Sequence, residues 1–153
     1  MYHIVKNQTE IEFDEKTLQF TFRKTGGTSW KWQEDYAPCM ECEGGTVYFR
    51  DGEKISHEIL KTGVGEGIVS TYEGFRNNGH RVPYKFQTVV WVEEVSGEIY
   101  CEWIPVCEEG LEVKKVFWPG PMAFEEKRED WYTLLTNRQG MLIPNTWETK
   151  LHT

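Results

Sequence analysis

The sequence lacks any long apolar run, and it lacks an excess of positive charge. No stretch approaches the roughly 20 apolar residues that a membrane-spanning helix needs. The N-terminal segment MYHIVKNQTE has no apolar run either, so we expect no signal peptide and a cytoplasmic location. The net charge of -8 argues against nucleic acid and anionic membranes as partners, because both attract basic patches.

Helical periodicity is also missing, because no segment sustains it for ten residues. The best helical candidate is FEEKREDWYTLL, residues 124–135, which is expected to form a turn or two before Trp131, with exposed ion pairs. Strand patterns dominate instead, and Leu18, Phe20 and Phe22 alternate with polar residues. About ten strands with frequent turn signals are typical of a sandwich or barrel. The 153-residue chain therefore predicts a single all-β domain.

Several short segments have the composition of turns between strands. Asp51-Gly52 is a preferred pair for a two-residue hairpin turn. GVGEG, residues 63–67, indicates a glycine-rich turn between two short strands, and no helix pattern follows it as a phosphate-binding loop requires. The clearest predicted hairpin joins residues 86–92 and 99–106 through a Ser-Gly turn.

The apolar strand positions predict a two-sheet antiparallel sandwich and its core. WYTLLTNRQGMLIPNTW, residues 131–147, indicates a further hairpin of core-type residues with a tight turn at 137–140. Alternation at period two predicts the following core residues: Phe20, Phe22, Val89, Trp91, Ile99, Trp103 and Phe117.

Cysteine is scarce, and the spacing of the cysteines bears on metal and redox chemistry. CMEC, residues 39–42, has the gap of a zinc half-site or redox motif. CEWIPVC, residues 101–107, has five residues and a proline between its cysteines and is a poor half-site. No helix pattern follows Cys39, as a redox motif requires. We therefore expect reduced, metal-free cysteines and no cofactor. The histidines are scattered and predict no metal cluster: His3, His57, His80 and His152.

Two segments are candidates for binding carbohydrate. SWKWQEDY, residues 29–36, contains Trp30, Trp32 and Tyr36, whose flat rings could stack on the apolar faces of sugars. For Trp30 and Trp32 we favour the interpretation that their shared strand face is the core. YEGFRNNGHR, residues 72–81, is expected to be a polar loop that offers hydrogen-bond donors to hydroxyl groups. Its candidate residues are Arg76, Asn77, Asn78 and His80.

The order of the segments resembles a known type of domain. The resemblance covers roughly residues 60–150 and rests on TGVGEGIVSTYEGF, FQTVVWVEEVSGEIYCEWIPV, VKKVFWPGPMAFE and YTLLTNRQGMLIPNTW. These segments are similar to the N-terminal β-sandwich domain of large glycoside hydrolases, in the style of the alpha-glucosidase and endo-alpha-N-acetylgalactosaminidase groups. In those enzymes a galactose-mutarotase-like supersandwich precedes a catalytic (β/α)8 barrel.

The resemblance implies both a fold and a function. Residues 1–153 would form one mutarotase-like sandwich domain at the N-terminal end of a longer enzyme, with the catalytic carboxylates beyond Thr153. The domain itself would be non-catalytic, pack on the barrel of the same polypeptide and form one wall of its carbohydrate cleft. Polar, glycine-rich loops face the barrel in such enzymes, which favours residues 72–81 over residues 29–36 as that wall.

Two other functions remain open from the sequence. One is a free-standing carbohydrate-binding module or lectin with Trp30, Trp32 and Tyr36 as its platform. The other is a small aldose epimerase in which a histidine acts as general acid. The 25 acidic residues single out no catalytic pair, so no catalytic residue is assigned.

Overall fold

Strands, as expected from period-two alternation, dominate the described part of the chain. The computed structural model describes residues 1–27, 29–77, 79–106, 112–124, 132–135 and 141–144. Among these residues the only helix is the three-residue 3-10 turn η1 (Phe49–Asp51), so no helix there could span a membrane. The strands are β1 (Tyr2–Lys6), β2 (Thr9–Asp14), β3 (Gln19–Lys24), β4 (Ser29–Trp32), β5 (Cys39–Cys42), β6 (Gly45–Tyr48), β7 (Lys54–Lys61), β8 (Gly65–Asn77), β9 (His80–Glu93), β10 (Ile99–Pro105), β11 (Val113–Phe117), β12 (Met122–Phe124), β13 (Tyr132–Leu135) and β14 (Met141–Pro144).

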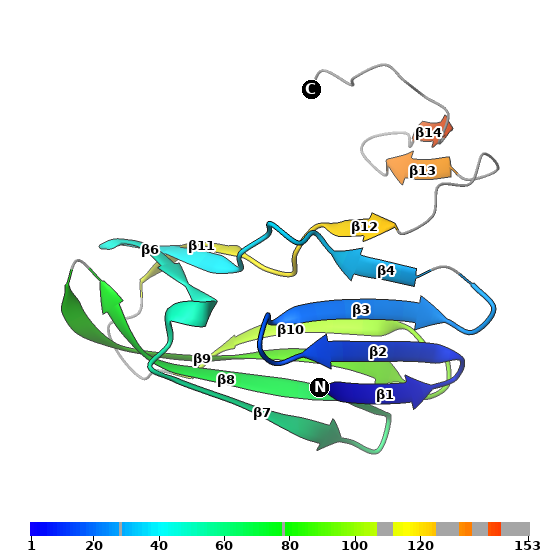
Figure 1. Ribbon diagram of the computed structural model, residues 1–153, viewed down its shortest axis with the longest axis horizontal. Coiled ribbons are helices and arrows are strands. Elements are labelled where there is room, and N and C mark those ends of the chain that lie inside the picture. The colour runs from blue at the N-terminus through cyan, green and yellow to red at the C-terminus, as the bar shows by residue number, and fades with distance from the viewer. Residues whose placement is uncertain (28, 78, 107–111, 125–131, 136–140, 145–153) are drawn as a thin grey trace.

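The described strands pair antiparallel in four sheets (Figure 1). A five-stranded sheet has the order β1-β2-β3-β4-β12, and a four-stranded sheet has the order β10-β9-β8-β7. A three-stranded sheet, β11-β5-β6, lies beside the five-stranded one over the far ends of β8 and β9. One layer of the sandwich is therefore the four-stranded sheet, and the other layer is built from two sheets. The all-β antiparallel sandwich predicted from the sequence is confirmed.

The core lies between these two layers and is rich in aromatic rings. Under the five-stranded sheet, the Phe13 and Phe20 ring centroids are 4.4 Å apart. Under the three-stranded sheet, Phe49 lies 4.6 Å from Phe86, which stacks on Tyr72 at 5.0 Å. Each fully buried ring contributes about 1.5–3 kcal/mol to folding. The long strands β8 and β9 thus tie the two halves of the second layer into one core.

The predicted core residues are partly right. Phe20 and Phe22 are buried in the core, and Ile99 and Trp103 are half-buried against it. Val89 is also buried, but it lies on the opposite face of β9 from the core residues Val90 and Val92. Phe117 is only half-buried, and Lys115 Nζ lies 4.5 Å from its ring centroid.

Trp91 was wrongly predicted to be in the core. Its neighbours Val90 and Val92 are 0% exposed and face the core, so Trp91 points from the opposite face of β9. The run VVWV is apolar at every position, and alternation therefore cannot choose its inner face.

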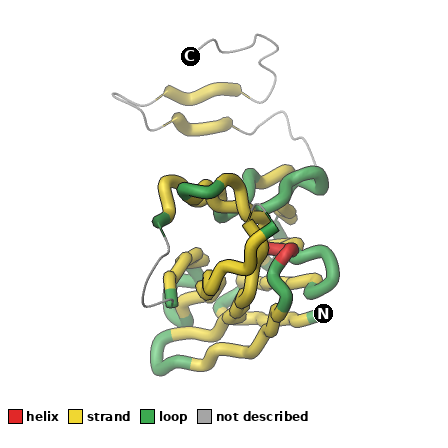
Figure 2. Tube along the Cα trace, turned by 90° about the vertical axis from the view of Figure 1, so that its left-hand side faces the viewer, coloured by secondary structure: helices red, strands yellow, loops and turns green. Residues whose placement is uncertain are grey.

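The predicted hairpins meet mixed outcomes. β9 and β10 pair with Val92 opposite Ile99, as predicted. The β13–β14 hairpin is also confirmed, while its turn lies outside the described residues. Both views place this hairpin beyond the edge of the sandwich (Figure 1, Figure 2). The helical turn expected before Trp131 falls on residues 125–131, which lie outside the described part.

Two turn predictions need correction. Asp51-Gly52 does not form a hairpin turn, because Asp51 belongs to η1 and the flanking strands β6 and β7 lie in different sheets. Residues 72–81 are not a polar loop. Residues 72–77 and 80–81 form the end of the long β8–β9 hairpin, with Asn77 opposite His80, because the two strands continue their pairing to within two residues of each other.

Candidate functional site

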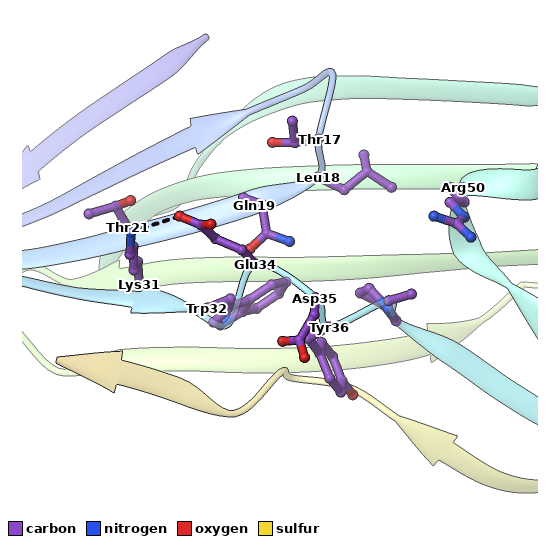
Figure 3. A pocket seen from close by; sticks show the side chains of 12 residues that line it. Thr17, Leu18, Gln19, Thr21, Lys31, Trp32, Glu34, Asp35, Tyr36 and Arg50 are labelled. Atoms are coloured by element: carbon purple, nitrogen blue, oxygen red, sulfur yellow. Dashed lines mark hydrogen bonds and ion pairs between the residues drawn. The ribbon is translucent and has the colours of Figure 1, made fainter. Parts of the chain in front are cut away.

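A pocket of about 520 Å³ opens where the five-stranded and three-stranded sheets meet (Figure 3). This volume suits a small organic ligand, since ligand pockets usually measure about 300–1,000 Å³. Its walls come from the start of β3, the end of β4, residues 33–38 and η1. The close view shows Thr17, Leu18 and Gln19 on one side of the opening, Asp35 and Tyr36 on the other, and Arg50 at one end.

The local sequence holds the wall formed by residues 33–38 in place. The Gln33 amide donates to the Pro121 carbonyl at 3.0 Å, and the Tyr36 hydroxyl donates to the Phe117 carbonyl at 2.5 Å. Gly120 packs so closely that an added Cβ would lie 2.6 Å from Tyr36 Cδ1. Burial, with a smaller effect from Cys39, raises the pKa of Tyr36, so its hydroxyl stays protonated. These contacts hold residues 33–38 against residues 117–121.

The polar groups of the pocket carry both signs of charge. Lys31 Nζ pairs with Glu34 Oε1 at 3.0 Å on the rim, and Asp35 and Arg50 add one charge of each sign. Among described residues, Gln19 Oε1 is buried without a hydrogen-bond partner. Such a set of amide, hydroxyl and charged groups suits a polar, uncharged ligand, because no single sign of charge dominates.

The structure separates the three candidate aromatic residues of residues 29–36. Trp32 is 1% exposed, which confirms the core interpretation for this ring. Tyr36 and Trp32 both line the 520 Å³ pocket. Trp30 is 37% exposed and lines a different opening of about 350 Å³, together with Ile99 and Met122. Sugar binding by these residues stays a prediction.

The second candidate segment lies at the tip of the β8–β9 hairpin. Arg76 Nε is 3.4 Å from Glu53 Oε1, and Arg81 Nη2 is 2.8 Å from Glu53 Oε2. His80 is exposed, Asn77 is placed through its backbone pairing with His80, and Asn78 lies outside the described residues. A pocket of about 420 Å³ beside Arg81 shares no described lining residue with the first pocket. Hydroxyl recognition at this tip also stays a prediction.

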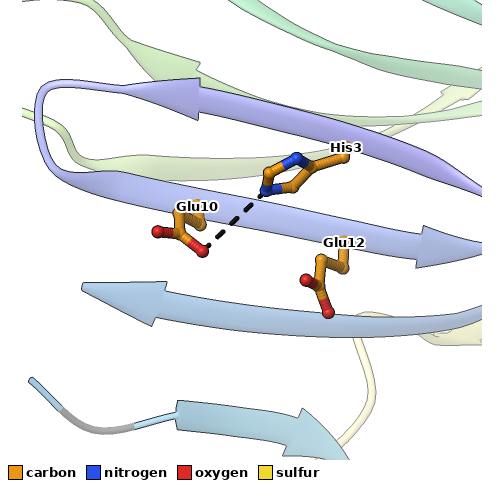
Figure 4. Close-up of side chains that lie close together, drawn as sticks. All are labelled: His3, Glu10 and Glu12. Carbon is orange, nitrogen blue, oxygen red and sulfur yellow. Dashed lines mark ion pairs between the residues drawn. The ribbon is translucent and has the colours of Figure 1, made fainter. Parts of the chain in front are cut away.

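One cluster of potential metal ligands is not predicted from the sequence. His3, Glu10 and Glu12 offer ligand atoms within 4.8 Å of one another (Figure 4), because β1 and β2 place His3 opposite Glu12. Spacing along the chain could not reveal this cross-strand group. Arg23 Nη1 already lies 3.2 Å from Glu10 and 3.8 Å from Glu12, so we interpret the cluster as an exposed ion-pair network.

The described cysteines do not form a chelating set. Cys39 and Cys42 lie three residues apart on β5, so their side chains leave opposite faces of the strand. Cys39 and Cys101 are free thiols, while Cys107 lies outside the described residues.

A histidine–serine pair lies between the sheets. His57 Nδ1 is 2.8 Å from Ser70 Oγ, but Ser70 is 1% exposed and out of reach of a substrate. This contact therefore satisfies the Ser70 hydroxyl within the core.

The comparisons with known proteins point to one class. No protein-family model matches the chain, and no curated protein matches it. Among solved structures, the chain is similar to part of a glycoside hydrolase.

The similar enzyme is the alpha-N-acetylgalactosaminidase NagBb from Bifidobacterium bifidum. Its Gal-NHAc-DNJ complex matches with a TM-score of 0.84 and 35% identity over 99% of this chain and 24% of that one. Its GalNAc complex gives 0.83 and 34% over 99% and 23%, and its ligand-free form gives 0.80 and 32% over 99% and 23%. The chain thus spans less than a quarter of that enzyme and has the fold of one of its parts.

Proposed function

We propose that this chain is the non-catalytic, N-terminal β-sandwich domain of a glycoside hydrolase that acts on α-linked N-acetylgalactosamine or a closely related sugar. The observation that carries the proposal is the similarity to NagBb, at 35% identity and a TM-score of 0.84 over 99% of this chain. Since 24% of NagBb is matched, most of that enzyme has no counterpart in these 153 residues. The catalytic carboxylates would belong to that unmatched part.

The domain would pack on a catalytic (β/α)8 barrel of the same polypeptide and form one wall of its cleft. The tip of the β8–β9 hairpin supports this arrangement. Arg76 and His80 are exposed there, and the side chain of Arg76 is 66% exposed even though it pairs with Glu53. A guanidinium held by a carboxylate is a preorganised donor for a hydroxyl group. The mutarotase-like type of sandwich, the single-domain organisation of residues 1–153 and the cytoplasmic location belong to the same proposal.

The reading frame around this segment tests the proposal. We expect roughly 250 or more further residues after Thr153, because a (β/α)8 barrel needs about that length. A stop codon directly after Thr153 would contradict the domain proposal. It would favour a free-standing carbohydrate-binding module, for which the 520 Å³ pocket lined by Tyr36 is the supporting observation.

A further inference from the structure

The outer face of the four-stranded sheet carries a fixed pair of aromatic rings. Trp91 on β9 lies opposite Tyr100 on β10, and their rings stack with centroids 4.6 Å apart and planes 16° apart. Trp91 Nε1 donates to Glu102 Oε1 at 2.7 Å, and the Tyr100 hydroxyl donates to Glu98 Oε2 at 2.9 Å. Both rings are therefore oriented by carboxylates before any ligand arrives.

Two glycines of β8 make room for this pair. An added Cβ at Gly65 would lie 2.7 Å from Trp91 Cε3, and one at Gly67 would lie 2.3 Å from Trp91 Cβ. The GVGEG segment thus has a packing role, since any side chain at Gly65 would collide with the Trp91 ring. The ring position is set by the backbone of β8 as well as by Glu102.

The exposure of the pair leaves one ring face for a ligand. Tyr100 is 41% exposed and Trp91 is half-buried. Because Trp91 covers one face of the Tyr100 ring, the opposite face is the one left open. Glu98 and Glu102 are both exposed beside it and can accept hydrogen bonds from hydroxyl groups.

The charges around the rings decide what kind of ligand fits. Glu58, Glu98 and Glu102 are exposed on or beside this face. Buried interface cores between proteins are depleted of charged residues, and an unpaired buried carboxylate is costly. A neutral sugar combines an apolar C–H face for the ring with hydroxyl donors for the carboxylates, so it matches both features.

We propose that Tyr100, oriented by Trp91 and flanked by Glu98 and Glu102, forms a platform that binds a hexose unit of a neutral glycan. The platform deepens the proposed function, on which the expectation of a carbohydrate ligand rests. Tyr100, Glu98 and Glu102 contact the sugar, and Trp91 acts as a positioning residue. A single open ring face of this kind gives weak, millimolar binding, equivalent to about 4 kcal/mol.

The test follows the Trp91 indole N–H signal in 15N-labelled residues 1–153, assigned with Trp91→Phe. The probes are methyl N-acetyl-α-galactosaminide and methyl α-glucopyranoside at up to 100 mM. We expect a saturable shift of this signal with at least one probe. Tyr100→Ala should weaken binding about tenfold or more, while Tyr100→Phe keeps the ring and stays within about twofold of the parent. Tyr48→Ala is the matched control, since Tyr48 is 38% exposed on β6, and it should change nothing.

Two results would overturn the platform. One is the absence of any shift of the Trp91 signal at 100 mM of either probe. The other is an equal loss of binding in Tyr48→Ala and Tyr100→Ala. If the signal ignores both sugars but is buried in the longer polypeptide, this face is a protein interface and the glycan proposal is wrong. The titration needs no catalytic region, so it can succeed or fail independently of the reading-frame test.

Discussion

Replacing Gly67 by alanine should destabilise the sandwich far more than the same change at Gly63 in the same GVGEG segment. At Gly67 the new Cβ would lie 2.4 Å from the Val90 carbonyl oxygen and 2.6 Å from Trp91 Cα. These are backbone atoms of the central strand β9, so relief requires the sheet to shift. Overpacking of this severity costs about 3 kcal/mol or more.

Two other glycines provide the scale for this effect. At Gly63 nothing lies within 4 Å of an added Cβ, and its φ is outside the left-handed region. Alanine there should be neutral or should stabilise by about 0.4–1 kcal/mol through the unfolded chain. At Gly79, φ is +79° with open space around it, so alanine should cost about 1–2 kcal/mol from backbone strain alone.

Urea denaturation followed by tryptophan fluorescence measures all three variants on one scale. We expect Gly63→Ala to be the most stable variant, Gly79→Ala to be intermediate and Gly67→Ala to be the least stable. For a chain of this size, 3 kcal/mol corresponds to a melting temperature lower by about 6–12 °C. A Gly67→Ala protein as stable as Gly63→Ala would refute the close approach of β8 to Trp91.

Three further predictions concern single side chains. Burial raises the pKa of Cys101 to about 11 from 9.0, so its thiolate fraction at pH 8 is roughly 100-fold lower than in the unfolded chain. Iodoacetamide labelling of Cys101, mapped by mass spectrometry, should be correspondingly slower in the folded protein than in urea. Equal labelling rates in the two conditions would contradict this burial. Burial lowers the pKa of His57 below 6.5, so the unfolded state binds more protons and stability should fall as pH drops below about 6.5. Urea denaturation midpoints measured from pH 8 to pH 5 should fall less steeply in His57→Gln than in the parent. Identical slopes in the two proteins would contradict a neutral, half-buried His57. Arg76→Ala and Asn77→Ala should lower the activity of the proposed longer enzyme. Arg76→Ala should change the free energy of unfolding of residues 1–153 by less than about 1 kcal/mol, because its ion pair with Glu53 is exposed. A large loss of stability, or unchanged activity in both variants, would contradict the placement of this hairpin tip in the cleft.

Strand alternation predicts the fold class because each sheet buries one face. Phe20 and Phe22 alternate with polar residues, and both rings are in the core. The same rule fails at VVWV in β9, where every position is apolar and the burial of Val90 and Val92 shows that Trp91 faces outward. Residues 72–81 contain many polar residues and two glycines, yet residues 72–77 and 80–81 are strand because β8 and β9 continue their hydrogen-bonded pairing there.

The candidate site depends on contacts that chain spacing does not encode. The sequence identifies Tyr36 as a candidate only because it is an aromatic residue in an aromatic segment. The hydrogen bond that orients it joins Tyr36 to Phe117, 81 positions further along the chain. His3 and Glu12 lie close together because of the register of β1 and β2, and no local sequence motif predicts this register. The stacking of Trp91 on Tyr100 likewise requires the β9–β10 register. Cross-strand registers of this kind become visible only once the strands are paired.

The most direct test of the central claim compares residues 1–153 with the longer polypeptide that the proposed function predicts. Both are incubated with p-nitrophenyl N-acetyl-α-galactosaminide, and release of nitrophenol is followed over the same time. A non-catalytic sandwich domain of a glycoside hydrolase predicts hydrolysis by the longer polypeptide and none above the blank by residues 1–153. Hydrolysis by residues 1–153 alone, or a longer polypeptide without activity on this or any other nitrophenyl glycoside, would contradict it.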